Sequence, residues 1–126
     1  MIESNWMLFA GGIVGGVVAL IHGVVMDRVI VRPIDRALSA GVRMNAGARG
    51  LITPLLQYST FAWLIGGLAV MAVALTMGAE VRVAIGLLVG SSYLYAAVAN
   101  LWMTRGKHPG GWLMVLAVGL IGVSLA

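Results

Sequence analysis

The sequence predicts an all-α polytopic membrane protein, a four-transmembrane-helix bundle with a short cytoplasmic interfacial helix. Two observations lead to this prediction. The composition is 61% hydrophobic and 10% charged, with a mean hydropathy of +1.04, which is too apolar for a water-soluble domain of this length. The apolar residues are also concentrated in four stretches without Asp, Glu, Lys or Arg, at residues 4–26, 50–79, 83–104 and 109–126.

Each stretch approaches or exceeds the length that a membrane-crossing helix needs. The hydrocarbon core is crossed by about 20 predominantly apolar residues, and in lipid only helices or closed barrels satisfy every backbone amide. The stretches are continuous apolar runs without the alternation of barrel strands, so helices are favoured. We place the spans of a single transmembrane domain at residues 4–26, 51–77, 83–104 and 109–126.

The basic residues predict the orientation in the membrane. Seven of the eight Lys and Arg residues lie in two loops, at residues 27–50 and 105–108, and only Arg82 lies between the second and third spans. By the positive-inside rule, both basic loops are cytoplasmic and both termini lie on the outer side. This use of the basic charge leaves no reason to expect a nucleic-acid partner. The residues expected to meet lipid headgroups are Arg28, Arg32, Arg36, Arg43, Arg49, Arg105 and Lys107.

The first basic loop is long for a helical hairpin, and the sequence predicts a short helix within it. Pro33 suits the first position of a helix and Gly41 suits its end, while Ile34 and Leu38 share one side. We expect residues 33–40 to form an interfacial helix at the level of the headgroups. Two roles stay open for the loop: a linker that only sets the topology, and an element that docks a partner.

Small residues recur at four-residue intervals along the spans. Such faces let helix backbones approach closely, which allows helices to associate in lipid. Packing within one bundle and self-association of several copies both use such faces, and both stay open here. The residues assigned to helix packing are Gly11, Gly15, Ala19, Gly23, Gly86 and Gly90.

Polar residues within or beside the spans form one candidate cluster. His22 lies about one turn before the end of the first span, Gln57 about two turns into the second, and Asn100 about one turn before the end of the third. Because consecutive spans run in opposite directions, these positions converge on the cytoplasmic third of the bundle, with Tyr95 and His108 within reach. The cluster either fixes the bundle by hydrogen bonds or forms a proton, ion or small-molecule site.

No catalytic or metal-binding signature accompanies this cluster. The chain has no cysteine, which excludes disulfides, thiolate metal sites and a cysteine nucleophile. No carboxylate lies within a span, which argues against a proton-coupled four-helix multidrug exporter. We therefore expect no metal site, no cofactor and no enzymatic activity. Haem ligation by His22 and His108 is kept as an alternative.

Three segments carry a resemblance to a known pattern: residues 19–23 (ALIHG), 56–60 (LQYST) and 105–109 (RGKHP), the last leading to Trp112. The chain resembles an uncharacterised family of small four-helix bacterial integral membrane proteins. That pattern has a histidine in the first span, another early in the second, and Arg, Gly and His-Pro before the fourth. Gln57 stands at the place of the second histidine. The resemblance implies the four-helix fold and a bacterial inner membrane location, and it implies no activity. With the orientation predicted from the basic residues, both termini are then periplasmic.

The function expected from the sequence is that of a non-catalytic, membrane-embedded accessory or interaction protein. Its expected partners are the lipid bilayer and a second copy of the chain or another membrane protein. A small transporter or channel with a polar pathway near the cytoplasmic side is the alternative. A haem- or quinone-binding membrane subunit is the second alternative.

Overall fold

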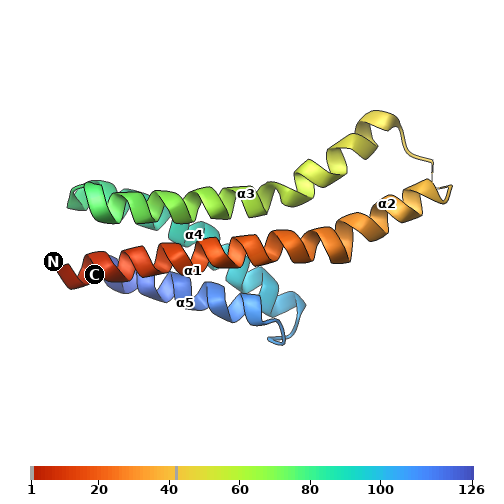
Figure 1. The fold of residues 1–126 in the computed structure, drawn as a ribbon. Helices are drawn as coiled ribbons and strands as arrows, with labels where there is room; N and C mark the ends of the chain where they lie inside the picture. The colour runs from red at the N-terminus through yellow and green to blue at the C-terminus, as the bar shows by residue number, and fades with distance from the viewer. Residues whose placement is uncertain (1, 42) are drawn as a thin grey trace.

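The computed structural model describes residues 2–41 and 43–126, which form an all-α structure (Figure 1). Three long helices are apolar enough to cross a membrane, and a shorter apolar helix follows at the C-terminal end. The first long helix is continued by a π-helical turn and a short helix. In chain order the elements are α1 (Ile2–Met26), η1 (Asp27–Val31), α2 (Arg32–Ser39), α3 (Ala46–Thr76), α4 (Ala79–Met103) and α5 (Pro109–Leu125).

The four apolar helices pack side by side as a bundle. Helix α1 lies between α3 and α5, while α4 packs against α5 and less extensively against α3. Both chain termini lie at one end of the bundle, and the connection between α4 and α5 lies towards the other (Figure 1). This second end, which carries Arg105 and Lys107, is called the basic end below.

Tyr93 of α4 fills the centre of the bundle. Its side chain is fully buried, and its hydroxyl donates a hydrogen bond of 2.8 Å to the backbone carbonyl of Trp63. The aromatic ring lies against a glycine of α1, since a Cβ at Gly15 would be 2.1 Å from Tyr93 Cε2. A Cβ at Gly67 of α3 would be 3.0 Å from the Tyr93 hydroxyl. The missing side chains of these glycines therefore make room for a large residue from a third helix.

The small-residue faces lie against neighbours of the same chain. Helices α1 and α3 approach closely where a Cβ at Gly12 would be 2.7 Å from the carbonyl oxygen of Gly67. Ala19 is fully buried. Each predicted packing glycine likewise has neighbours from another helix of the bundle within 4 Å of an added Cβ: Gly11, Gly15, Gly23, Gly86 and Gly90. Packing within one bundle therefore uses these faces.

Helix α1 continues beyond the first charge-free stretch. Residues Asn5–Ser39 form one helical segment of 35 residues that runs past the connection between α4 and α5 (Figure 1). The expected loop at residues 27–50 is therefore mostly helical, and the helix expected at residues 33–40 corresponds to α2, in line with α1 instead of separate from it.

The continuation past Pro33 has a local cause. Proline has no N–H and would leave an α-helical carbonyl without its donor, but Pro33 falls in the first turn of α2. The preceding turn is widened, because the N–H of Arg32 bonds the carbonyl of Asp27, five residues earlier. A π-helical turn of this kind accommodates the proline without ending the helix.

The continuation pairs with the start of α3, and we call residues 27–53 the hairpin. Arg49 of α3 donates hydrogen bonds of 2.8 Å to both Asp35 and Ser39 on the opposite arm. Val31 of the first arm is buried and lines a small hollow together with Ile52 and Thr53 of the second arm. Asn45 caps α3, since its side chain accepts a hydrogen bond of 2.7 Å from the N–H of Ala48. The hairpin is thus an ordered pair of helix ends.

Candidate functional site

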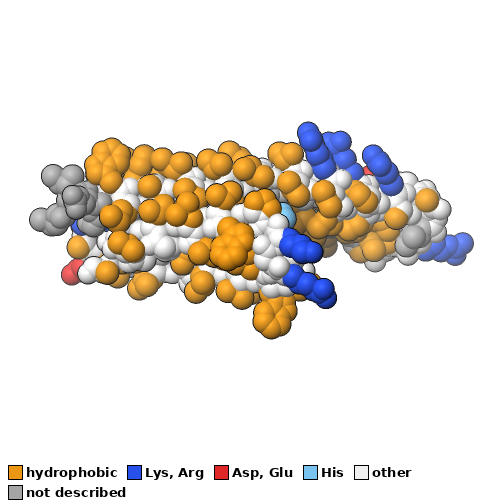
Figure 2. All heavy atoms as spheres, turned by 90° about the horizontal axis from the view of Figure 1, so that it is seen from below, with side chains coloured by type: hydrophobic (Ala, Val, Ile, Leu, Met, Phe, Trp, Pro, Cys, Tyr) orange, Lys and Arg blue, Asp and Glu red, His pale blue; other side chains and the backbone are white. Residues whose placement is uncertain are grey.

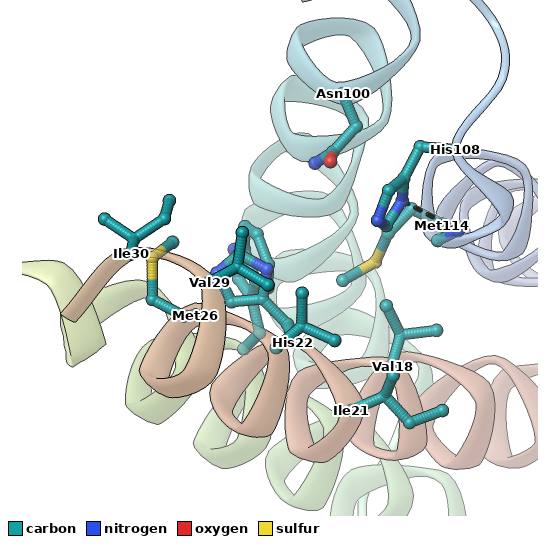
Figure 3. A pocket seen from close by; sticks show the side chains of 12 residues that line it. Val18, Ile21, His22, Met26, Val29, Ile30, Asn100, His108 and Met114 are labelled. Carbon is teal, nitrogen blue, oxygen red and sulfur yellow. Dashed lines mark hydrogen bonds between the residues drawn. The ribbon is translucent and has the colours of Figure 1, made fainter. Parts of the chain in front are cut away.

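A cavity of about 190 Å³ opens at the basic end of the bundle (Figure 3). It lies between the last turns of α1, the turn η1, the end of α4 and the beginning of α5. Three polar side chains from three different segments reach it: His22, Asn100 and His108. The rest of the lining is apolar or backbone: Val18, Ile21, Val25, Met26, Val29, Ile30, Trp63, Gly110 and Met114.

His22 is half-buried at the boundary between α1 and α3. Its Nε2 lies 3.2 Å from the hydroxyl oxygen of Ser59 on α3. Its ring also packs against the indole of Trp63, with 4.7 Å between ring centroids and an interplanar angle of 56°. The imidazole is therefore held by a hydrogen bond and an aromatic contact from the same neighbouring helix.

His108 is the N-cap of α5. Its Nδ1 accepts a hydrogen bond of 3.1 Å from the backbone N–H of Gly110. A nitrogen that accepts has its lone pair there, so in the neutral ring the proton is on Nε2. Figure 3 shows the capping contact on one side of the ring and the cavity on the other. The helix cap thus makes the second ring nitrogen a hydrogen-bond donor.

Asn100 reaches the cavity from the last turns of α4. Its Nδ2 donates a hydrogen bond of 3.0 Å to the carbonyl of Ala96, one turn earlier on the same helix. The backbone here is tied to the start of α5, because Thr104 donates to the carbonyl of Asn100 at 2.7 Å and accepts from the N–H of His108 at 3.3 Å. The tight connection at Arg105 and Gly106, with φ of 53° and 74°, therefore fixes Asn100 and His108 relative to each other.

Two residues of the predicted cluster lie elsewhere. Gln57 donates a hydrogen bond of 3.0 Å to the carbonyl of Gly23 and accepts one of 2.9 Å from Thr60, so it joins α3 to α1. Tyr95 is 77% exposed on α4 and does not line the cavity. The structure therefore brings His22, Asn100 and His108 together around one cavity and places Gln57 and Tyr95 outside it.

The apolar walls of the cavity were not predicted from the sequence. Val18, Ile21, Val25 and Val29 follow one another on α1 and η1 at spacings of three and four residues, so they share the helix face of His22. That periodicity was a usable signal. Trp63 of α3 is buried in the interior and also forms part of the cavity wall.

The basic residues gather at one end of the molecule and along the hairpin (Figure 2). Among the described residues two ion pairs occur, Arg32 with Asp27 and Arg49 with Asp35, each at 2.8 Å. All the predicted headgroup residues are exposed: Arg28, Arg32, Arg36, Arg43, Arg49, Arg105 and Lys107. Hydrophobic side chains cover the adjoining bundle face in the same view.

Within residues 2–41 and 43–126, no group of three or more His, Asp or Glu side chains is placed to hold a metal ion. The hydrogen bond to His108 Nδ1 also argues against haem ligation by His108. In the neutral ring it leaves the proton on Nε2, and a protonated nitrogen has no lone pair for iron. Comparison of the chain with protein-family models, with curated proteins and with solved structures finds no match.

Proposed function

We propose that the protein is a non-catalytic, membrane-embedded interaction protein that crosses the bilayer four times and self-associates. The apolar length of α1, α3 and α4 supports three crossings. Helix α5 has 17 residues, about 26 Å at 1.5 Å per residue, which is slightly less than the hydrocarbon thickness. It packs against both α1 and α4, and a short span is accommodated by local thinning of the bilayer.

The orientation we propose places the basic end in the cytoplasm of a bacterial cell and both termini in the periplasm. The arginines of the hairpin and of the connection between α4 and α5 then meet the anionic inner leaflet. Trp102 and Trp112 are exposed at the basic end, 81% and 59% respectively, where aromatic side chains anchor spans at the interface.

One observation supports the interaction role: the continuous segment Asn5–Ser39, of 35 residues, and α3, of 31 residues, are longer than α4 and α5 and form the hairpin together (Figure 1). The arm of residues 27–39 adds about 20 Å to α1. A bundle that only crossed the membrane would need no such extension. The hairpin exposes Val29 and Leu51, at 65% and 56%, beside its arginines. It offers a mixed apolar and basic surface at the membrane boundary.

The same two helices, α1 and α3, also form a groove between them in the bundle portion. An apolar groove of about 190 Å³ runs between α1 and α3, and a Cβ at Gly16 would have its nearest neighbour 3.9 Å away. Side chains of a second copy fit such a groove, and close packing of this kind is what associates helices in lipid. The groove and the hairpin belong to one continuous α1–α3 face, so we assign self-association to that face.

A transporter is less well supported. Two residues that line the cavity, Val18 and Trp63, and the central Tyr93 fill the described core and are at most 9% exposed. A polar pathway across the bundle would have to displace these side chains. The cavity therefore ends inside the bundle instead of continuing through it.

Single-cysteine crosslinking tests the proposal, because the chain has no native cysteine. Ile13→Cys lies in the groove and Leu94→Cys lies on α4, and the two native side chains are similarly exposed, 44% and 50%. We expect oxidation in membranes to give disulfide-linked dimers with Ile13→Cys and few with Leu94→Cys. Equal crosslinking at both positions, or a monomer by light scattering in mild detergent, would contradict self-association through this face.

A further inference from the structure

We propose that the cavity at the basic end binds a quinone-type amphiphile: a single six-membered ring with carbonyl oxygens, joined to an apolar tail. This binding activity goes beyond the interaction role proposed above and does not depend on self-association. Its basis is the combination of cavity size, the placement of polar hydrogen-bonding groups, and an apolar opening.

The size of the cavity fits one ring. An engineered apolar cavity of about 150 Å³ is known to admit benzene. At about 190 Å³, this cavity has room for a six-membered ring with small substituents. A porphyrin, a macrocycle of four pyrrole rings, needs a larger chamber than this one. The indole of Trp63 provides a flat wall for a planar ring to pack against.

The polar groups select carbonyl oxygens. Because the Gly110 N–H occupies His108 Nδ1, the Nε2–H of His108 is a donor on the cavity side (Figure 3). Asn100 also points into the space between the helices in this view and has a second N–H beside the one that bonds Ala96. Two donors on one side of an apolar chamber favour a ligand with acceptor oxygens over a hydrocarbon.

The opening of the cavity suits an apolar tail. Ile21 and Val29 line the cavity and are 52% and 65% exposed, so its rim is apolar and open at the surface. In the proposed orientation this rim lies where the hydrocarbon meets the headgroups, close to Arg105 and Lys107. A quinone ring with an isoprenoid-like tail would place its ring among the polar groups and its tail in lipid.

The test compares two planar six-membered rings with the same four methyl groups, one with carbonyl oxygens and one without. Duroquinone, a tetramethylbenzoquinone, is titrated into the purified full chain in detergent, and quenching of tryptophan emission gives its affinity. Durene, the tetramethylbenzene of the same shape, is measured by competition. We expect duroquinone to bind about three- to tenfold more tightly, since a net hydrogen bond contributes that much to an equilibrium. Equal affinities, or no saturable binding of duroquinone, would overturn the proposal.

A matched set of variants identifies the site. His108→Ser keeps an N-cap oxygen for α5 but removes the ring donor, so the preference for duroquinone over durene should fall towards onefold while the protein stays folded. Asn100→Leu should weaken the preference in the same direction. Gln57→Leu removes a polar side chain that does not line the cavity, and it should leave the preference unchanged. An unchanged preference in His108→Ser, or the same loss in Gln57→Leu, would show that the quinone binds elsewhere.

Discussion

The ring of Tyr93 occupies the space that a side chain at Gly15 would need. An added Cβ there would lie 2.1, 2.3 and 2.4 Å from Cε2, Cζ and the hydroxyl oxygen of Tyr93. These residues come from α4 and α1, which are on opposite sides of the bundle, and the hydroxyl continues to the carbonyl of Trp63 on α3. One tyrosine thus contacts three helices, and the place of its ring depends on the missing side chain of Gly15.

Gly15→Ala should therefore destabilise the bundle. The expected loss is about 1–3 kcal/mol, the range for overpacking a well-filled core, because the ring must move and its hydrogen bond to Trp63 is strained. Thermal unfolding in detergent measures the change. Gly122→Ala is the matched control, since an added Cβ there has no neighbour within 4 Å. A stability equal to that of the control would mean that Tyr93 is not packed against α1.

The orientation is tested by labelling single cysteines with a membrane-impermeant maleimide in intact cells. Ala46→Cys in the hairpin and Lys107→Cys between α4 and α5 should be protected, whereas Thr76→Cys at the opposite end of the bundle should react. All three native residues are exposed, so access to the side chain is not the limiting factor. Permeabilised cells provide the control in which all three sites react. Labelling of Ala46→Cys from outside would reverse the topology.

Asn45→Ala should loosen the beginning of α3. The side chain of Asn45 accepts a hydrogen bond from the Ala48 N–H, and loss of such a cap removes about 1 kcal/mol of helix stability. Amide hydrogen exchange should become faster in the first turn of α3 and stay unchanged in α4. Asn45→Ser retains a capping oxygen and should behave like the parent. Unchanged exchange in Asn45→Ala would show that the hairpin is held by other contacts.

His22→Asn separates a structural role from a proton or ion pathway. Asparagine keeps a hydrogen-bonding side chain near Ser59, but its charge does not change with pH. Imidazole is the side chain that ordinarily changes charge between about pH 5 and 8. We expect both the parent and His22→Asn to show no pH-dependent flux when reconstituted in liposomes. A reproducible proton or ion current in the parent that His22→Asn abolishes would favour the transporter over the interaction protein.

The sequence predicts the long apolar helices well because a bilayer imposes a strong length requirement. It predicts the hairpin poorly. Asp27 and Arg28 mark the end of the apolar run, but charge ends a membrane span and does not end a helix. The π-helical turn before Pro33 depends on a backbone hydrogen bond five residues apart, which leaves no distinct pattern in the residue types.

The candidate site was predictable in part for a similar reason. The depth of a residue in the membrane follows from its position along the span. His22, Asn100 and His108 could therefore be expected at one depth near the cytoplasmic side. Which face a side chain occupies is harder to infer: Tyr93 and Tyr95 are two residues apart, and the first is fully buried while the second is 77% exposed. The angular step of about 100° per residue separates them, and only the packing of glycines around α4 decides which one turns inward.

Helix α1, the turn η1 and helix α2 form one continuous helical rod, so a tilt of its bundle end also moves its other end. Its bundle portion forms one wall of the cavity, and the arm of residues 27–39 forms half of the hairpin. The arm is about 20 Å long, so a change of about 5° in the tilt of α1 displaces its tip by about 2 Å. Because Arg49 ties this arm to α3, a small change in tilt where α1 meets α5 would move the whole hairpin, including Arg36, by more than it moves the cavity wall.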